Sequence, residues 1–155
     1  MKAKNIMNTT PLTIHADATF QQLVALFNEQ QIDGVCVVEG ENKLVGVITL
    51  FELFGAFLPG YVSIKEELAH LIHESYFEEK CKELKHQPVR SLMRTDVITI
   101  KEEENLIGVM ADISKFRLMV VPVVRGQTLV GTIARKGLLA YTSKVLLENN
   151  TQSKE

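Results

Sequence analysis

The spacing of apolar residues changes along the chain in a regular order. Residues 20–30 place apolar side chains at intervals of three and four, which is the spacing of one helix face. That face is formed by Phe20, Leu23, Val24 and Phe27. Thr19, with Gln22 three residues later, matches a capping box. The pattern therefore predicts an amphipathic helix that begins directly after Thr19.

Runs rich in β-branched residues flank this helix. Residues 11–15 form a short extended segment, and a turn containing Gly40 separates residues 34–39 from residues 43–49. The two runs on either side of the turn predict a β-hairpin. Because an apolar helix is expected at 50–57, the predicted order of elements is β-α-β-β-α.

The same order occurs a second time. Residues 6–54 align on residues 92–139 with one gap, at a shift of about 86 residues. Asn105 takes the capping place of Thr19. Two copies predict a pseudo-twofold pair rather than a solenoid. The elements of the second copy are expected at 97–101, 106–116, 120–125, 128–134 and 136–148.

An insert of different character separates the copies. The segment "SIKE" at 63–66 matches a capping box and predicts a long helix over 64–85. Its apolar stripe, expected to pack against the core or a partner subunit, is Leu68, Leu71, Ile72 and Tyr76. The predicted organisation is a first repeat at 1–57, a helical insert at 58–90, a second repeat at 91–148 and a disordered tail at 149–155.

Composition narrows the class of protein. The net charge is −2 and 46% of the residues are hydrophobic, which suits a packed domain and gives no basic surface for nucleic acid. The most apolar run, 47–64, contains Glu52 and a Pro-Gly pair and is too interrupted to span a bilayer. Cys36 and Cys81 have no motif spacing, so two reduced thiols in a cytoplasmic protein are expected. The first residues lack the apolar stretch of a signal peptide.

The repeated segments resemble a tandem pair of CBS domains, named after cystathionine β-synthase. The resemblance lies in "IMNTTPLTI" with "LMRTDVITI", "IDGVCVV" with "RLMVVPVV", and "LVGVITLFEL" with "LVGTIARKGL". It implies an α+β fold of two β-α-β-β-α units with a cleft on each side of the pseudo-twofold. It also implies a homodimer and a regulatory, energy-sensing role that is not enzymatic. The implied ligands are AMP, ADP, ATP or S-adenosylmethionine, with no required cofactor.

One polar pair in the first copy suits ribose recognition. Thr49 lies at the expected start of a helix, and Glu52 lies one turn further on. A carboxylate there can accept hydrogen bonds from both ribose hydroxyls, and a threonine can add a third contact. CBS domains carry aspartate where this chain has Glu52, which extends the carboxylate by one methylene. The alternative is that Glu52 only caps the helix or faces solvent.

The resemblance implies that each cleft combines residues of both copies. The cleft of Thr49 and Glu52 would draw its adenine wall from the second copy, with a phosphate contact from Arg117. The wall positions are Asp96, Ile98, Leu118, Met119 and Val120. The opposite cleft, expected to bind ribose weakly or not at all, would use Thr10, Leu12, Ile32, Asp33, Ala134 and Gly137.

No other group of residues predicts chemistry. His70 and His73 are three residues apart, whereas the zinc motif on a helix requires a spacing of four, and no third ligand is evident. Cys81 and His86 lack a partnering acid, so no catalytic and no metal residues are predicted. The chain is expected to be a regulatory module that binds an adenine nucleotide, and the alternative is a dimerisation or docking module with vestigial clefts.

Overall fold

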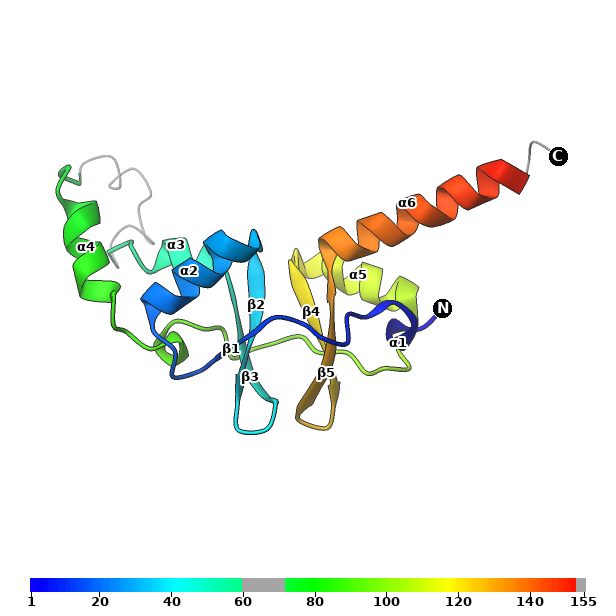
Figure 1. Ribbon diagram of the computed structural model, residues 1–155, viewed down its shortest axis with the longest axis horizontal. Coiled ribbons are helices and arrows are strands. Elements are labelled where there is room, and N and C mark those ends of the chain that lie inside the picture. The colour runs from blue at the N-terminus through cyan, green and yellow to red at the C-terminus, as the bar shows by residue number, and fades with distance from the viewer. Residues whose placement is uncertain (60–71, 153–155) are drawn as a thin grey trace. The chain divides into compact units, whose positions relative to one another are not determined.

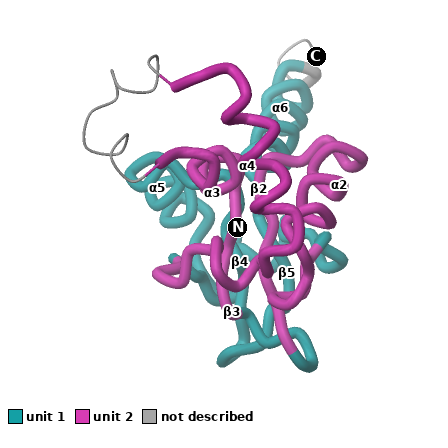
Figure 2. The backbone as a smooth tube through the Cα atoms, turned by 90° about the vertical axis from the view of Figure 1, so that its left-hand side faces the viewer, with its two compact units in different colours: residues 1–12, 40–44, 98–155 teal, residues 13–39, 45–97 magenta. Residues whose placement is uncertain are grey.

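The computed structural model describes residues 1–59 and 72–152. The element order along the chain can be followed in Figure 1. The chain forms two compact units (Figure 2). Unit 1 contains Met1–Leu12, Gly40–Leu44 and Ile98–Glu155, and unit 2 contains Thr13–Glu39 and Val45–Val97. The mixed α+β class predicted from the sequence is confirmed.

Unit 2 holds most elements of the first sequence repeat. They are β1 (Thr13–His15), α2 (Phe20–Gln30), β2 (Gly34–Glu39), most of β3 (Lys43–Thr49) and α3 (Leu50–Gly55). The unit also contains α4 (Tyr76–Leu84) of the insert and the 3-10 turn η2 (Val89–Ser91) that follows it. Strand β1 pairs with β2 in parallel, and β3 lies on the other side of β2. The predicted capping box of α2 is present. The Thr19 N–H donates to Gln22 Oε1 at 2.9 Å, and the Gln22 N–H donates to Thr19 Oγ1 at 3.2 Å.

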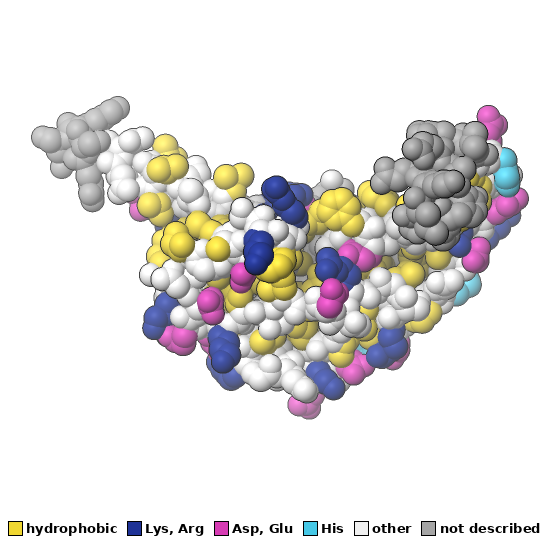
Figure 3. Space-filling view, turned by 180° about the vertical axis from the view of Figure 1, so that it is seen from behind, with side chains coloured by type: hydrophobic (Ala, Val, Ile, Leu, Met, Phe, Trp, Pro, Cys, Tyr) yellow, Lys and Arg dark blue, Asp and Glu magenta, His cyan; other side chains and the backbone are white. Residues whose placement is uncertain are grey.

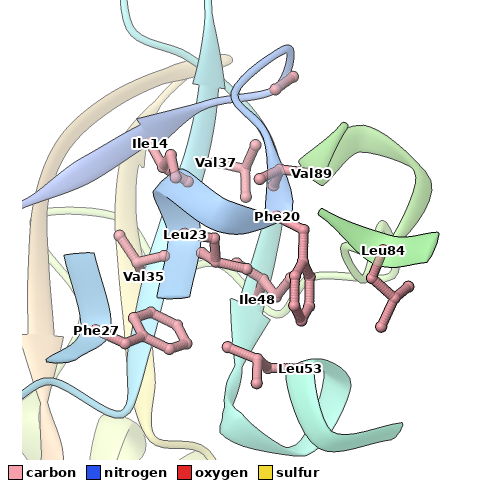
Figure 4. Packing of buried hydrophobic residues seen from close by; sticks show 11 residues of the cluster. Ile14, Phe20, Leu23, Phe27, Val35, Val37, Ile48, Leu53, Leu84 and Val89 are labelled. Atoms are coloured by element: carbon pink, nitrogen blue, oxygen red, sulfur yellow. The ribbon is translucent and has the colours of Figure 1, made fainter. Parts of the chain in front are cut away.

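The core of unit 2 lies between its strands and helices (Figure 4). Helix α2 contributes the predicted residues Phe20, Leu23 and Phe27, whereas Val24 is exposed. Strands β2 and β3 add Val35, Val37 and Ile48, and α3 adds Leu53. Burial of these apolar side chains provides the main stabilisation of the unit.

Unit 1 holds most elements of the second repeat. They are α5 (Leu106–Phe116), β4 (Val120–Arg125), β5 (Thr128–Ala134) and α6 (Arg135–Gln152). The unit also contains α1 (Ala3–Ile6) from the start of the first repeat. Asn105 caps α5 as predicted, because its side chain accepts the Ile107 N–H at 2.8 Å. Strands β4 and β5 form the expected antiparallel hairpin, and Lys43 at the start of β3 pairs with Thr128. The strand order of the five-stranded sheet is β1-β2-β3-β5-β4.

The leading segments of the two repeats are exchanged between the units. The first twelve residues belong to unit 1, where Asn8 bridges to Thr132 of β5. The segment that leads into the second repeat belongs to unit 2 as far as Val97, and there Arg94 bridges to Val47 of β3. Each unit therefore takes its leading segment from the other sequence repeat. The predicted repeat boundaries describe the duplication in sequence, and the compact units divide the chain differently.

Each leading segment crosses its strand at a glycine. A Cβ on Gly46 would lie 2.6 Å from Met93 Sδ and 2.7 Å from the Arg94 carbonyl oxygen. A Cβ on Gly131 would lie 2.8 Å from both Met7 Sδ and the Asn8 carbonyl oxygen. Side chains do not tolerate such distances, so glycine is required at both positions by close approach rather than by an unusual φ.

The insert differs from the predicted long helix. Its capping box, Leu68, His70 and Leu71 lie outside the described residues. Residues 72–75 are not helical, and α4 begins only at Tyr76. A local turn takes the place of the predicted helix at these residues, because the Tyr76 N–H donates to the His73 carbonyl at 3.1 Å and Ser75 Oγ contacts His73 Nδ1 at 2.8 Å. The half-buried Tyr76 packs inside unit 2, where its O–H donates to the Phe57 carbonyl at 2.6 Å.

Three further expectations differ from the structure. The expected strand over 97–101 is reduced to one parallel bridge between Ile100 and Val123. Helix α3 ends at Gly55, two residues earlier than expected, and a turn follows. The tail was expected to be disordered from residue 149, whereas α6 continues to Gln152 and only residues 153–155 lie outside the description. Among the described helices, none has the length and apolar character that crossing a membrane requires.

Candidate functional site

The start of α3 is organised by the predicted polar pair. Thr49 is the N-cap residue, and its Oγ1 accepts the Phe51 N–H at 3.2 Å. The Thr49 N–H donates to Glu52 Oε2 at 2.8 Å, and the Thr49 hydroxyl donates to the same oxygen. This is a complete capping box, which requires the length of a glutamate or glutamine at the third helical position. Of the two roles considered for Glu52, the structure shows capping, and the ribose contact stays a prediction.

The two carboxylate oxygens of Glu52 have different surroundings. Oε2 carries the capping contacts, whereas Oε1 lies 3.8 Å from Nε of Arg94. The Glu52 side chain is 16% exposed, so the carboxylate is largely buried but still reachable from solvent. Oε2 therefore stabilises the start of α3, whereas Oε1 can exchange Arg94 for another hydrogen-bond donor.

Arg94 connects this carboxylate to a second one. Its guanidinium contacts Asp96 through Nε and Nη2, both at 3.4 Å. The hydrogen bonds and the positive charge of Arg94 lower the pKa of Asp96 below its ordinary value. The Arg94 main chain is held by β3, because its N–H donates to the Val47 carbonyl at 2.9 Å and its carbonyl accepts the Val47 N–H at 3.0 Å. Asp96 therefore lies beside the capping box within unit 2.

Sequence reasoning did not identify Arg94 as a site residue. In the alignment of the repeats it corresponds to Asn8, although the neighbouring Met and Thr positions are identical in both copies. The sequence offered one signal for such a site residue, which is that a positively charged side chain occurs in one leading segment and not at the equivalent position of the other. Its meaning depends on the contact with Glu52, which lies 42 positions earlier in the sequence (94 − 52) and cannot be derived from a local pattern.

Unit 1 gathers predicted residues at the equivalent strand-helix junction. Val120 pairs with Ala134 across the β4–β5 hairpin, and the Arg135 N–H donates to the Met119 carbonyl at 3.2 Å. Leu118 packs against the unit 1 core. Arg117 ends α5 in the left-handed conformation, with φ at 55°, and is exposed. Ile98, Leu118, Met119 and Val120 are all half-buried.

The residues predicted for the opposite cleft are distributed over both units. In unit 2 the Leu50 N–H donates to the Asp33 carbonyl at 3.0 Å, which places Asp33 next to the start of α3. Ile32, directly before it, is half-buried. In unit 1 the Thr10 N–H donates to Asn8 Oδ1 at 3.0 Å. Leu12, Ala134 and Gly137 are exposed. The structure thus brings predicted residues together inside each unit, and their combination into two clefts stays a prediction.

The two cysteines are free thiols in different surroundings. Cys36 is buried in β2, and burial raises the pKa of its thiol to about 12. Cys81 is half-buried on α4. Within residues 1–59 and 72–152, no group of three His, Cys, Asp or Glu side chains is arranged to hold a metal ion.

Comparison with known families identifies both repeats. The model of the CBS domain family matches residues 3–59 and again residues 89–144, which together exceed half of the chain. A curated relative, the glycine betaine/carnitine/choline transport ATP-binding protein OpuCA of Bacillus subtilis, is 27% identical over 139 residues. The alignment covers 89% of this chain and 30% of the relative. The chain spans about a third of the length of the first curated relatives that it matches.

Solved structures share the fold at low identity. The protein AcuB of Vibrio cholerae, named for acetoin utilization, matches with a TM-score of 0.76 at 20% identity, covering 100% of this chain and 97% of that one. CBSX2, solved in complex with AMP, matches at 0.70 and 14% identity, covering 93% and 97%. The CBS domain pair of MJ0100, solved with 5′-methylthioadenosine and S-adenosyl-L-methionine, matches at 0.66 and 19% identity, covering 93% and 97%. The two family matches, supported by this shared fold, show that the chain belongs to the CBS domain family.

Proposed function

We propose that this chain is a regulatory module that binds an adenosyl nucleotide of the AMP, ADP or ATP class. Related CBS proteins support the ligand class, because CBSX2 was solved with AMP and MJ0100 with 5′-methylthioadenosine and S-adenosyl-L-methionine. The observation that carries the proposal is the junction at Thr49 and Glu52. There, one carboxylate oxygen is used by the helix cap and the other faces an exchangeable partner.

The chemistry of this junction suits a ribose. Two neighbouring hydroxyls are hydrogen-bond donors, and a carboxylate oxygen accepts more than one such bond. Glu52 Oε2 already accepts from the Thr49 N–H and hydroxyl, so Oε1 is the acceptor that a ribose would use. We therefore assign Glu52 a double role, in which it caps α3 and contacts the sugar.

The other predicted binding residues remain part of the proposal. Asp96 stands beside the junction in unit 2, with its side chain 80% exposed. The residues expected to contact the adenine or the phosphates from unit 1 are Ile98, Arg117, Leu118, Met119 and Val120. Half-buried apolar side chains and main-chain groups suit the face and the edge of a purine. We also propose a cytoplasmic location, where adenine nucleotides are abundant, and a regulatory rather than catalytic role.

A ligand can regulate this protein only if it binds one conformation more tightly than another. A nucleotide that contacts one state better than another shifts the population toward that state, which changes the affinity for a partner. We propose that the protein senses the concentration of the nucleotide in this way, as expected of an energy-sensing module.

A melting series tests the proposal. The chain is heated with AMP, ADP, ATP or S-adenosylmethionine, and binding is confirmed by calorimetry. A ligand at 100 times its dissociation constant adds about 2.7 kcal/mol to the free energy of unfolding. For a chain of this size, that raises Tm by roughly 5–10 °C. No shift with any of the four ligands at millimolar concentration contradicts the proposal.

Glu52→Gln separates ribose binding from capping. A glutamine at the third position still completes a capping box, as Gln22 does at the start of α2. The variant should therefore keep its stability but lose the charge that strengthens the ribose contact, so nucleotide affinity should fall about tenfold. Gln22→Glu is the matched control, because it makes the converse change at the other capping box and should leave affinity unchanged.

A second candidate function is dimerisation and protein docking without a ligand. Exposed apolar side chains favour it, and some of them lie along α6 (Figure 3). On α3 these residues are Phe51 and Phe54, and on α6 they are Leu139, Leu146 and Leu147. We propose a homodimer under either function, since exposed apolar helix surfaces of this kind mark interaction sites. Under the docking function, Glu52→Gln changes nothing, whereas Phe51→Ser with Phe54→Ser changes the oligomeric state in sedimentation measurements.

A further inference from the structure

The cation beside Glu52 bears on which adenosyl ligand the chain binds. We propose that Arg94 makes the junction of Thr49 and Glu52 selective for phosphorylated adenosine and unfavourable for a positively charged sulfonium ligand. The inference rests on the proposed function, because it concerns the same site. The juxtaposition that carries it is the 3.8 Å separation of Arg94 Nε from Glu52 Oε1, the oxygen that the helix cap does not use.

The main chain of Arg94 is anchored while its side chain is half-exposed. Its N–H and carbonyl both bond to Val47, two residues before Thr49 on β3. Gly46, which has no Cβ, allows the leading segment to approach this strand closely. The Arg94 side chain is 52% exposed. The guanidinium can therefore turn toward a ligand, whereas its starting point next to the capping box is held by main-chain hydrogen bonds.

The present partners of Arg94 are weakly held. Its contacts with Asp96 measure 3.4 Å and its contact with Glu52 measures 3.8 Å, which are long for charge-assisted hydrogen bonds. Arg90, in the same unit, contacts Glu39 at 2.9 Å and Asp17 at 3.2 Å. Solvent-exposed ion pairs of this kind contribute little, and Asp96 is among the most exposed of these partners. A phosphate that accepts two hydrogen bonds from the guanidinium fork can therefore displace Asp96.

The same proximity disfavours a cationic ligand. Any group that replaces the present contact at Glu52 Oε1 comes next to the guanidinium of Arg94. The charge of Glu52 is already partly balanced by two donors of Thr49. The exposed carboxylate of Asp96 can turn into solvent, whereas the main chain of Arg94 is held at this place by Val47 and its guanidinium is a cation. A sulfonium ligand would meet this charge without a compensating anion of its own near the sugar.

Calorimetry with three ligands tests the inference on the full chain. AMP, adenosine and S-adenosylmethionine are titrated into the unaltered protein and into Arg94→Gln. We expect AMP to bind the unaltered protein at least about tenfold more tightly than adenosine, the effect of a hydrogen bond to a charged group. Arg94→Gln should remove most of this preference while leaving adenosine affinity within about twofold. Arg90→Gln is the matched control, since it removes an arginine of unit 2 that contacts Asp17 and Glu39 instead.

A second variant does not depend on the folding of Arg94→Gln. Asp96→Asn removes the competing carboxylate at an exposed position, so the ratio of AMP affinity to adenosine affinity should rise about threefold, because any loss of an adenine contact affects both ligands alike. Any of four results overturns the inference and leaves the proposed function standing. They are equal binding of AMP and adenosine by the unaltered protein, an unchanged preference for AMP in Arg94→Gln, tighter binding of S-adenosylmethionine than of AMP, and no gain in the preference for AMP in Asp96→Asn. Failure of all three ligands to bind the unaltered protein, together with failure of ADP and ATP, overturns the proposed function itself.

Discussion

The two strand-helix junctions have the same main-chain pattern and different side chains. The Leu50 N–H donates to the Asp33 carbonyl in unit 2, and the Arg135 N–H donates to the Met119 carbonyl in unit 1. These pairs are equivalent in the sequence repeat. Thr49 and Glu52 form a capping box at the first junction, where the second has Ala134 and Gly137. The junction therefore forms without the polar pair, and its presence in unit 2 needs a separate explanation.

Helix length supplies part of that explanation. Helix α3 has 6 residues and α6 has 18. A short helix makes few internal hydrogen bonds relative to the groups left unpaired at its ends, so it depends more on capping. The polar pair therefore has a structural use in unit 2 that a long helix does not need. A ligand-binding role adds to this use and must be measured apart from it.

The largest expected loss of stability concerns the two glycines, Gly46 and Gly131, at which both units bring a leading segment close to a strand. Gly46→Ala places a Cβ within 2.7 Å of a carbonyl oxygen, and Gly131→Ala places one at 2.8 Å from another. Because neither strand nor leading segment can move away without losing hydrogen bonds, each variant should lose about 3 kcal/mol of unfolding free energy. Urea denaturation measures the loss.

Gly137→Ala is the control for these glycine variants. A Cβ at Gly137 would meet nothing within 4 Å, and the residue lies in α6. Alanine there should stabilise the chain by about 0.5–1 kcal/mol, because it has the higher helix propensity. Equal losses at Gly46 and Gly137 would contradict the close approach as the cause.

The next largest effect on stability concerns the N-cap threonine, which is present at the start of α3 and absent at the start of α6. Thr49→Ala removes the N-cap of α3 and should cost about 1 kcal/mol of unfolding free energy. Ala134→Ser, which adds a hydroxyl at the equivalent position of the long helix, should change stability by less than about 0.5 kcal/mol. Thermal unfolding of both variants tests whether the short helix depends more on its cap, and equal effects would remove that distinction.

The smallest expected effect on stability concerns the ion pairs that the leading segment of unit 1 makes with Glu103. In unit 1, Lys4 Nζ donates to Glu103 Oε1 at 2.7 Å, and Lys2 contacts the other oxygen. These hydrogen bonds lower the pKa of Glu103 from 4.5 to about 2. A lowered carboxyl pKa gives stability that is complete above about 4.5 and is lost as the pH falls toward 2. The unfolding free energy should therefore fall over this window.

Glu103→Gln should remove that part of the pH dependence. Because all three side chains are exposed, the effect should be small and should weaken further in high salt. Measurements of Tm between pH 2 and 6 compare the variant with the unaltered chain. Parallel curves would show that Glu103 does not contribute to the acid sensitivity of unit 1.

Much of the fold could be predicted because its signals are local. The capping box at Thr19, the N-cap at Asn105, the β4–β5 hairpin and the helical faces depend on residues a few positions apart. The long insert helix was predicted wrongly at residues 72–75, where a turn through His73 and Ser75 competes with helical hydrogen bonds. Helical periodicity does not report such competition, because polar side chains that favour a turn are also tolerated on a helix surface.

The candidate site was predictable only in part. Thr49 and Glu52 were found from their spacing, and their capping contact was among the alternatives considered. Arg94 was missed, because its main chain reaches β3 through a bridge to Val47 between distant segments. The charge of an arginine has no specific meaning until the path of the chain places it near another charge.

The sequence by itself determined the duplication, most of the order of elements and the capping boxes, since these follow from short spacings and from similarity between the copies. Its repeated motifs also carried the resemblance to the family. Only the tertiary structure decided which leading segment joins which unit and which cation faces Glu52. The two leading segments are so alike that local propensity cannot distinguish their destinations. The choice depends on main-chain bridges and close packing at Gly46 and Gly131, which form between residues far apart in the chain.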